Sequence, residues 1–314
     1  MALDHFVSQV HLRKFYSEAL GEAFYAIRKS ELNVFHQGAA NVCRIEDNST
    51  NHYLVDERIV EEFLKGVEPF YNNAVKDLAS GNLNQQVIYV ISGFIAYILT
   101  CSPAGMRIQS APLKSTVKAT SKLVEKIEGF PSPPESLRGK SFLDLIEKGK
   151  IKTVIDPKYP QAIGIMNILS SIKVLGNSAW EILHNPFDDS SFFTSDFPIC
   201  IEKTNDPRVL NKIVPLTPKL AIRILPNISI SEENLTYDFK EFKWRFKKLT
   251  RKEVFYINRH IVRCAESLVM FRDNKPWVSK FVKKNSKYRI EPKTTTISTE
   301  EGEFLWMSQE IKEV

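Results

Sequence analysis

A run of fifteen apolar and small residues, Val87 to Cys101, constrains the fold of this chain more than any other segment. Its sequence, VIYVISGFIAYILTC, holds no charged side chain. A helix needs about 20 apolar residues to cross a bilayer, and this run is shorter and contains Ser92 and Gly93. A helix that is apolar on all sides must be buried in a protein core. The run therefore predicts a central core helix within the 314-residue chain.

Helical periodicity continues on both sides of this run. Apolar residues at helical spacing predict a helix over 57–81, divided by Pro69, and an amphipathic helix over about 104–128. A long, mostly apolar helix is expected over 160–183. Between them, the Pro-rich stretch GFPSPPESLRGK, residues 129–140, predicts an extended internal linker. The middle of the chain is thus expected to be helical.

Strand-like composition lies toward both ends of the chain. Residues 23–46 indicate two or three short strands, and SFFTSDFPICIEK, 191–203, indicates a strand, a break and another strand. EFKWRFKK, 241–248, alternates aromatic and basic residues, which is typical of a half-buried strand. We predict an α+β fold, with the helical middle packed on a modest, mostly antiparallel sheet built from N- and C-terminal segments. Residues 1–291 are expected to form one domain, and 292–314 a loosely docked tail.

The N-terminal segment HFVSQVHLRKF places His5, Gln9 and Arg13 four residues apart. We predict a helix over 8–20, in which Gln9 and Arg13 share a face one turn apart. His5 is a candidate acid/base group, and Arg13 is a candidate clamp for a carboxylate or phosphate. The alternative is a hydrogen-bonded knot that fixes the N-terminus, and the spacing alone favours that alternative.

Two later stretches carry further candidate residues. In TSDFP, 194–198, Asp196 stands at a strand-to-turn junction, beside Ser195 as a candidate substrate-binding residue. Asp196 suits a base or a cation ligand, and it equally suits an Asx motif that bonds its own turn. In YINRHIVRC, Asn258 lies on an expected helix whose basic side chains indicate a solvated face.

Charge is distributed unevenly along the chain. The whole chain carries +6, yet residues 240–293 hold 17 Lys and Arg against five Asp and Glu, a net +12. This segment indicates an anionic partner or an anionic region of the same chain. Lys243, Arg245 and Lys247 alternate with aromatic residues, as in surfaces that neutralise phosphates and stack on bases. Aromatic residues of a strand, however, more often belong to the core.

Several classes of protein find no signature in the sequence. The four cysteines are scattered without CxxC, and no secretory signal is recognisable, which predicts a cytoplasmic protein with buried free thiols. The motifs GxGxxG, GxxxxGK[ST], HExxH and GxSxG are absent, and the six histidines are dispersed. We therefore expect no metal site and no membrane association, and no particular cofactor is implied.

Short motifs in a fixed order resemble the bacterial family DUF4238, whose name, domain of unknown function, assigns no reaction. That family opens H-Y-V-P-x-x-Y-L-R-x-F, with Pro where this chain has Ser8 and usually Tyr where it has His11. The resemblance spans roughly residues 5–270 and implies a bacterial or phage-related cytosolic protein. The residues that carry it are His5 to Ser8, Leu12, Arg13, Phe15, Trp180, Phe193 to Pro198, Pro215 to Pro218 and Asn258. The resemblance groups His5, Arg13, Asp196 and Asn258 as one constellation. Either a shared pocket or a structural hydrogen-bond network would account for such a pattern.

Two hypotheses of function follow. The first is an enzyme that acts on a phosphate-containing substrate, nucleic acid included, in a defence or toxin context; His5 and Asp196 would be catalytic. The second is a non-catalytic module that uses the basic segment 240–293 to bind nucleic acid or an acidic protein. An open cleft shared by the constellation supports the first, whereas dry and fully hydrogen-bonded side chains count against it.

Overall fold

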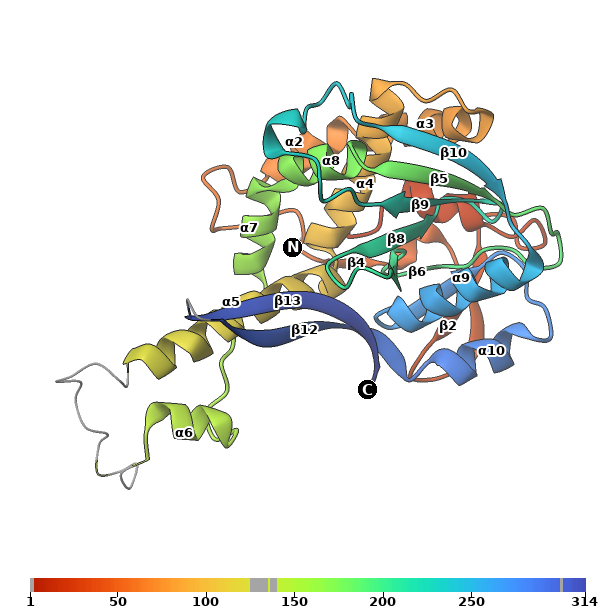
Figure 1. Cartoon of the computed structure of the whole chain (residues 1–314). Helices are drawn as coiled ribbons and strands as arrows, with labels where there is room; N and C mark the ends of the chain where they lie inside the picture. The colour runs from red at the N-terminus through yellow and green to blue at the C-terminus, as the bar shows by residue number, and fades with distance from the viewer. Residues whose placement is uncertain (1–2, 125–134, 136–139, 300–301) are drawn as a thin grey trace.

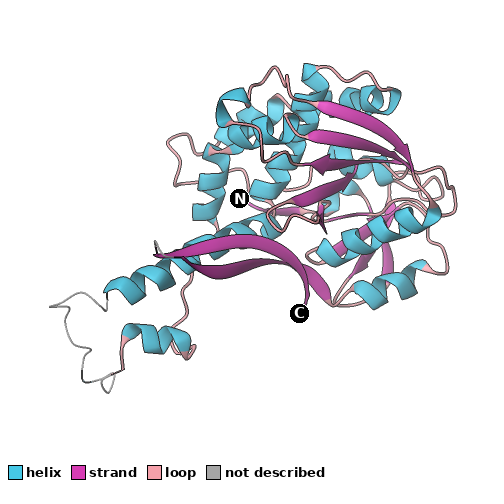
Figure 2. Ribbon diagram, in the orientation of Figure 1, coloured by secondary structure: helices cyan, strands magenta, loops and turns pink. Residues whose placement is uncertain are grey.

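A computed structural model of the chain describes residues 3–124, 135, 140–299 and 302–314. The fold is α+β, with a helical middle region and several small sheets whose strands are mostly antiparallel (Figures 1 and 2). The linker predicted over 129–140 lies almost wholly outside the described residues. The helical and strand segments predicted on either side of it are described below.

The helices follow the apolar periodicity, with two corrections. Pro69 stands in the first turn of its helix and divides the 57–81 segment as expected. The helix predicted over 8–20 already ends at Phe15, because Tyr16 is extended and Ser17 N–H donates to Ala23 O at 2.7 Å. The helices are α1 Gln9–Leu12 with the 3-10 turn η1 Arg13–Phe15, α2 Ile59–Lys65, α3 Glu68–Ser80, α4 Gln85–Cys101, α5 Pro103–Val124, α6 Phe142–Glu147, α7 Lys158–Met166, α8 Ile168–Gly176, α9 Arg251–Cys264 and α10 Val278–Asn285, with short 3-10 turns η2 Ala39–Asn41 and η4 Glu232–Asn234.

The second correction concerns the helix predicted over 160–183. It is two helices, α7 and α8, followed by a strand that contains Trp180. Asn177 ends α8: its side-chain amide donates to Lys173 O and also to Thr236 O, a residue far along the chain. Trp180 then pairs with strands on both sides, which local periodicity does not reveal.

Two larger sheets and two two-stranded pairs form the β part of the described structure. The five-stranded sheet has the order β10-β5-β9-β8-β7, antiparallel except for the β10–β5 pair. It is built entirely from 179–248, whereas the N-terminal segment contributes strands to the second large sheet, of order β3-β2-β11-β6, and to a separate two-stranded pair. The strands are β1 Leu3–His5, β2 Phe24–Arg28, β3 Val34–Gln37, β4 Arg44–Glu46, β5 Ala179–His184, β6 Thr194–Ser195, β7 Cys200–Lys203, β8 Leu210–Pro215, β9 Leu220–Leu225, β10 Lys243–Lys248 and β11 Leu268–Phe271; β1 pairs with β4.

Strand β10 is an exposed edge rather than the half-buried strand that its alternation predicted. Trp244 and Phe246 are 41% and 50% exposed. Their rings meet edge to face and approach Gly81, whose positive φ of 81° ends α3. As the outermost strand, β10 has a neighbour on one side only, so its aromatic face is covered in part.

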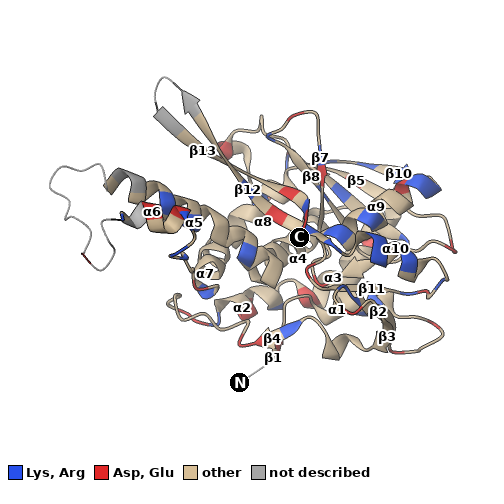
Figure 3. Ribbon diagram, turned by 90° about the horizontal axis from the view of Figure 1, so that it is seen from below, with Lys and Arg blue, Asp and Glu red and all other residues tan. Residues whose placement is uncertain are grey.

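The C-terminal segment is a β-hairpin, whereas the sequence predicted a loosely docked tail over 292–314. Strands β12 Tyr288–Thr299 and β13 Gly302–Glu313 pair antiparallel, with Ile297 opposite Phe304 and Thr295 opposite Trp306. Such cross-strand pairs of β-branched and aromatic residues stabilise a ribbon. Figures 1 and 3 show the hairpin lying beside α5. The predicted boundary at residue 291 therefore falls inside β12.

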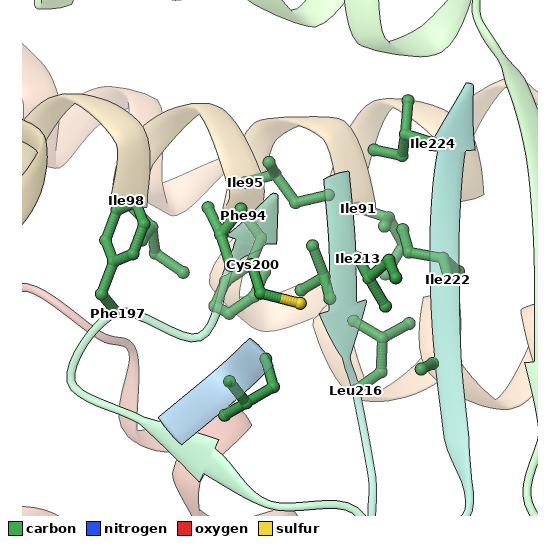
Figure 4. Close-up of a cluster of buried hydrophobic side chains, with 14 of the residues drawn as sticks. Ile91, Phe94, Ile95, Ile98, Phe197, Cys200, Ile213, Leu216, Ile222 and Ile224 are labelled. Atoms are coloured by element: carbon green, nitrogen blue, oxygen red, sulfur yellow. The ribbon is translucent and has the colours of Figure 1, made fainter. Parts of the chain in front are cut away.

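Helix α4 occupies the core, as the apolar run Val87–Cys101 predicted. Asn84 caps it by accepting a hydrogen bond from Val87 N–H, and 13 of its 17 residues are buried. Helices α3 and α8 pack against it. Figure 4 shows Ile91 and Ile95 of α4 in one apolar cluster with Ile222 of the five-stranded sheet. This cluster anchors the sheet to the helical part.

Two further expectations can be compared with the structure. The four cysteines are free and buried, as predicted, and burial raises the pKa of each thiol. Among the described residues no single helix has the length and apolar character to span a membrane. Helices α3 and α4 reach that threshold only when taken together, and they are bent by 117° at their junction.

Candidate functional site

The N-terminal motif forms a short chain of polar contacts. Arg13 donates to Gln9 Oε1 at 3.0 Å, and Gln9 Nε2 lies 3.5 Å from His5 Nδ1. Gln9 and Arg13 therefore share a face, as their spacing predicted. The His5 ring is partly buried, and burial lowers its pKa. Its Nε2 atom has no hydrogen-bond partner among the described residues. Arg13 is exposed and lies outside the cavity that His5 lines.

The cavity beside His5 is acidic. It measures about 460 Å³, and its lining includes Asp4, Glu61 and Glu68 but only one cation, Lys65. Three carboxylates around one ammonium group repel a phosphate rather than attract it. This cavity is therefore poorly suited to the anionic substrate that the enzyme hypothesis requires.

Asp196 lies in another cavity, of about 390 Å³, and is fully engaged in hydrogen bonds. Its carboxylate accepts from the backbone N–H groups of Glu266, Ser267 and Leu268 and from the Ser267 hydroxyl, at 2.7–3.0 Å. Burial raises the pKa of Asp196, and these four hydrogen bonds act against that rise. The carboxylate thus organises the turn that leads into β11, instead of its own turn as an Asx motif would.

Ser195 and Asn258 are also satisfied in the interior. Ser195 Oγ accepts from Phe197 N–H at 3.2 Å. Asn258 Oδ1 accepts from Phe193 N–H at 2.9 Å, and its amide donates to Ser191 O at 2.8 Å. Both side chains are fully buried. Asn258 therefore ties α9 to the segment before β6.

The four residues of the family constellation are not brought to one cleft. His5 and Asp196 line different cavities, and neither Arg13 nor Asn258 lines either of them. The roles assigned to these residues from the sequence stay predictions. Their geometry resembles the structural hydrogen-bond alternative more closely than a shared active site.

His11, which the sequence did not single out as a site residue, occupies the centre of a buried network. Its Nδ1 lies 2.8 Å from Tyr71 Oη and its Nε2 2.9 Å from Thr194 Oγ1. Burial lowers the pKa of His11 to about 3, so the imidazole is neutral at physiological pH. The network joins α1, α3 and β6. The sequence signal was a polar residue on the apolar face of the first helix.

Two of the three basic residues predicted on β10 are neutralised by carboxylates. Arg245 pairs with Glu181, which also accepts from Arg223 at 2.6 Å. Lys247 lies 2.8 Å from Glu253. Lys243 is exposed and has no ion pair within the described residues. Lys248 at the end of β10 is likewise exposed and without an ion pair in the described residues, so two of the four cations of β10 are balanced within the chain.

Helices α9 and α10 carry basic side chains of a different kind. Six of the basic residues on or next to these helices are solvent-exposed, and across the ranges that the structure describes none of the six has a carboxylate within 4.0 Å. Figure 3 shows Lys and Arg gathered on these two helices. Aromatic side chains lie between the helices: Phe255 contacts Trp277 and Phe281. We define the α9–α10 surface as Lys252, Arg259, Lys280, Lys283, Lys284 and Lys287.

Lysine spacing explains the α10 part of this surface. Lys280, Lys283, Lys284 and Lys287 follow the 3-4-7 spacing that places side chains on one helix face, the last just beyond the helix end. The opposite face buries Val278, Phe281 and Val282. The sequence showed a basic segment over 240–293, but not which of its charges would stay unpaired.

Metal-binding geometry is not found in the part of the chain that the structure describes: no group of three or more His, Cys, Asp or Glu side chains could hold an ion.

The fold and these surfaces define an α+β protein with a basic helical face. A family model described as "Protein of unknown function (DUF4238)" matches residues 4–275. The chain belongs to this DUF4238 family. No curated protein and no solved structure shows significant similarity to it.

Proposed function

We propose that this protein is a non-catalytic module that binds nucleic acid through the α9–α10 surface. One observation carries the proposal: three lysines of α10 and Lys287 just beyond it are exposed to solvent and, within the described residues, none is paired with a carboxylate. A duplex carries one phosphate charge per about 1.7 Å of its axis, and unpaired lysines release its counterions on binding. We propose that it does so in the bacterial cytoplasm, in a defence or toxin context.

The dimensions of the surface suit a nucleic acid backbone. Lys280 to Lys284 extend over about 6 Å of helix axis, at about 1.5 Å per residue, and Lys287 follows just beyond the helix end. Such a row of ammonium groups meets several phosphates without reading a base edge, so the binding we propose is independent of sequence. Phe255 is 40% exposed beside Lys252 and offers a stacking face for an unpaired base.

The enzyme hypothesis has weaker support from the same geometry. The cavity at His5 is lined by three carboxylates, and the Asp196 carboxylate already accepts four hydrogen bonds from the chain. An acidic protein partner remains the second candidate, because the lysines of α10 would also attract carboxylates. The experiment below separates the two partners.

The test is fluorescence anisotropy with a labelled oligonucleotide of mixed sequence, single-stranded and duplex, at several salt concentrations. We expect the logarithm of affinity to fall linearly with the logarithm of salt concentration, and the triple variant K280E/K283E/K284E to lose at least about tenfold in affinity. K150E/K152E is the matched control, because both lysines are exposed and lie near α6, away from α9 and α10.

Three outcomes would overturn the proposal. They are binding that does not change with salt, equal losses in the α10 and control variants, and displacement of the oligonucleotide by poly-glutamate at the same concentration of charge. The last result would point to an acidic protein. Circular dichroism of the triple variant checks its fold, which should be intact because the substituted side chains are exposed.

A further inference from the structure

A second basic site lies on another part of the molecule, between the C-terminal hairpin and the β7–β8 connection. Two cavities of about 320 and 350 Å³ adjoin there and share Pro207, Lys293 and Trp306 in their linings. Helix α5 closes one side through Ile108 and Pro112. Figure 1 shows the hairpin passing in front of the α5 end of the molecule. Each cavity lies in the size range of small-molecule sites. We call the pair the hairpin cleft.

The lining of the hairpin cleft is positively charged. Its cations are Lys203, Arg208, Lys212 and Lys293, and its only acidic residues are Asp206 and Glu310. The described lining therefore carries +2. Arg208 is held by Asp206 at 2.7 Å, and Lys293 lies 3.9 Å from Glu310. Within the described residues these pairs leave two cations of the cleft without a counter-charge, Lys203, which is exposed, and Lys212.

Lys212 stands on an apolar surface. Its cross-strand neighbours are Ile201 on β7 and Ile224 on β9, and residues directly opposite in a sheet share one face. Within the described residues its ammonium group has no carboxylate within 4.0 Å and no hydrogen-bond acceptor. Burial lowers the pKa of Lys212. A bound anion would supply the counter-charge that this ammonium group lacks.

Trp306 supplies a flat apolar face in the same cleft. It lies on β13 opposite Thr295, lines both cavities and remains 37% exposed. Indole rings stack on other flat rings, including nucleobases. An anion site and a stacking face thus occur side by side, on the sheet and on the hairpin.

We propose that the hairpin cleft binds a small phosphate monoester that carries a flat ring, of which a nucleoside 5′-monophosphate is the representative. Lys212 binds the phosphate, and Trp306 stacks on the ring. A phosphate monoester carries close to two negative charges at pH 7, which matches the +2 of the lining better than a single carboxylate does. The site does not depend on the α9–α10 surface, which is formed by other elements.

The test is isothermal titration of the full chain with adenosine 5′-monophosphate, with inorganic phosphate and with adenosine. We expect saturable binding of the monophosphate with a Kd at or below about 1 mM. Binding of the other two should be at least about tenfold weaker, since inorganic phosphate lacks the ring and adenosine lacks the phosphate. K212M should weaken binding of the monophosphate at least about tenfold, and W306L should also weaken it. Lys150→Met is the matched control and should bind like the wild type.

The Lys212→Met variant is expected to fold, because it replaces an unpaired charge by an apolar side chain of similar length. A thermal melt that is unchanged or shifted upward confirms this. The proposal is overturned by absence of saturation, by equal affinity for phosphate and monophosphate, or by unchanged binding in K212M. The K280E/K283E/K284E variant should bind the monophosphate normally, so failure of the nucleic-acid proposal and failure of this one are distinguishable.

Discussion

The Oδ2 atom of Asp196 accepts two hydrogen bonds from Ser267, one from its backbone N–H and one from its hydroxyl, each of 2.7 Å. With the N–H groups of Glu266 and Leu268, the carboxylate binds four donors around one turn. Asp196 N–H in turn donates to Leu268 O. A side chain with four donors from the chain holds β6 and β11 in register, which is a structural role.

Replacing Asp196 by Ala is expected to destabilise the fold. The change leaves several buried donors without an acceptor, which we expect to cost about 3 kcal/mol in the free energy of unfolding. Urea denaturation followed by circular dichroism measures this. Asp188→Asn is the control, because that carboxylate is 95% exposed and should change stability little. A D196A protein as stable as the wild type would contradict the structural role.

Stability should fall with acidity because of His11. The ordinary imidazole pKa of 6.5 is lowered to about 3 in the folded chain, so the unfolded chain binds a proton first as pH falls. The contribution of His11 is complete above pH 6.5 and is lost at about 1.4 kcal/mol per pH unit between pH 6.5 and about 3. Urea midpoints at several pH values should decline more steeply for the wild type than for His11→Gln. Parallel declines would refute this.

The two ends of the Glu181–Arg245 ion pair should respond very differently to mutation. Burial opposes the ionisation of Glu181, but hydrogen bonds from Arg245 and Arg223 outweigh it, and the pKa of Glu181 is lowered. Glu181 is 5% exposed and Arg223 12%, so Glu181→Gln should cost about 2 kcal/mol, because it removes a buried charge-assisted hydrogen bond and leaves Arg223 paired with Glu202 alone among the described residues. Arg245 is 73% exposed, and Arg245→Ala should cost less than about 1 kcal/mol. Equal losses in chemical denaturation would show that the pair is not asymmetric.

Arg107 should control how firmly the hairpin is attached. It donates two hydrogen bonds to Glu266, at 2.7 and 2.9 Å, and reaches Glu291 and Ile290 O at the base of β12. Arg107→Ala is expected to accelerate amide hydrogen exchange in 288–299 by about tenfold or more, while 85–101 in the core exchanges as before. The exchange rate of β12 in Arg107→Lys should lie between the rates in the wild type and in Arg107→Ala, because an ammonium group cannot make the bidentate contact. Unchanged exchange in β12 would show that other contacts hold the hairpin.

Segments whose structure depends on local composition were predicted well. The apolar run Val87–Cys101 is the core helix, Pro69 divides its helix, and Gly81 ends it with a positive φ. Each of these depends on a property that a residue carries with it: apolar area, a fixed φ, or freedom to adopt a left-handed conformation. The corrected segments depend on distant neighbours. Trp180 is in a strand because β9 and β10 pair with it.

The candidate site shows the same difference between what local sequence indicates and what distant neighbours determine. The sequence identified His5, Asp196 and Asn258 as chemically capable side chains, but their hydrogen-bond partners are set by the fold. Asp196 is satisfied by a turn about 70 residues away, as the separation from Ser267 shows. Nothing in the sequence distinguishes Lys212 from other lysines. Its apolar surroundings come from strand pairing, which places it opposite Ile201 and Ile224.

Apolar periodicity and backbone preferences are local properties of the sequence, so the chain's α+β class and its buried central helix can be predicted from the sequence. Which charged side chains form ion pairs cannot be predicted in this way, because Coulomb attraction acts between groups that only folding brings within a few ångströms. Arg245 and Lys283 belong to one basic segment of the sequence. In the structure Arg245 is paired with Glu181 across the sheet, while Lys283 faces solvent on α10, and tertiary packing alone made that difference.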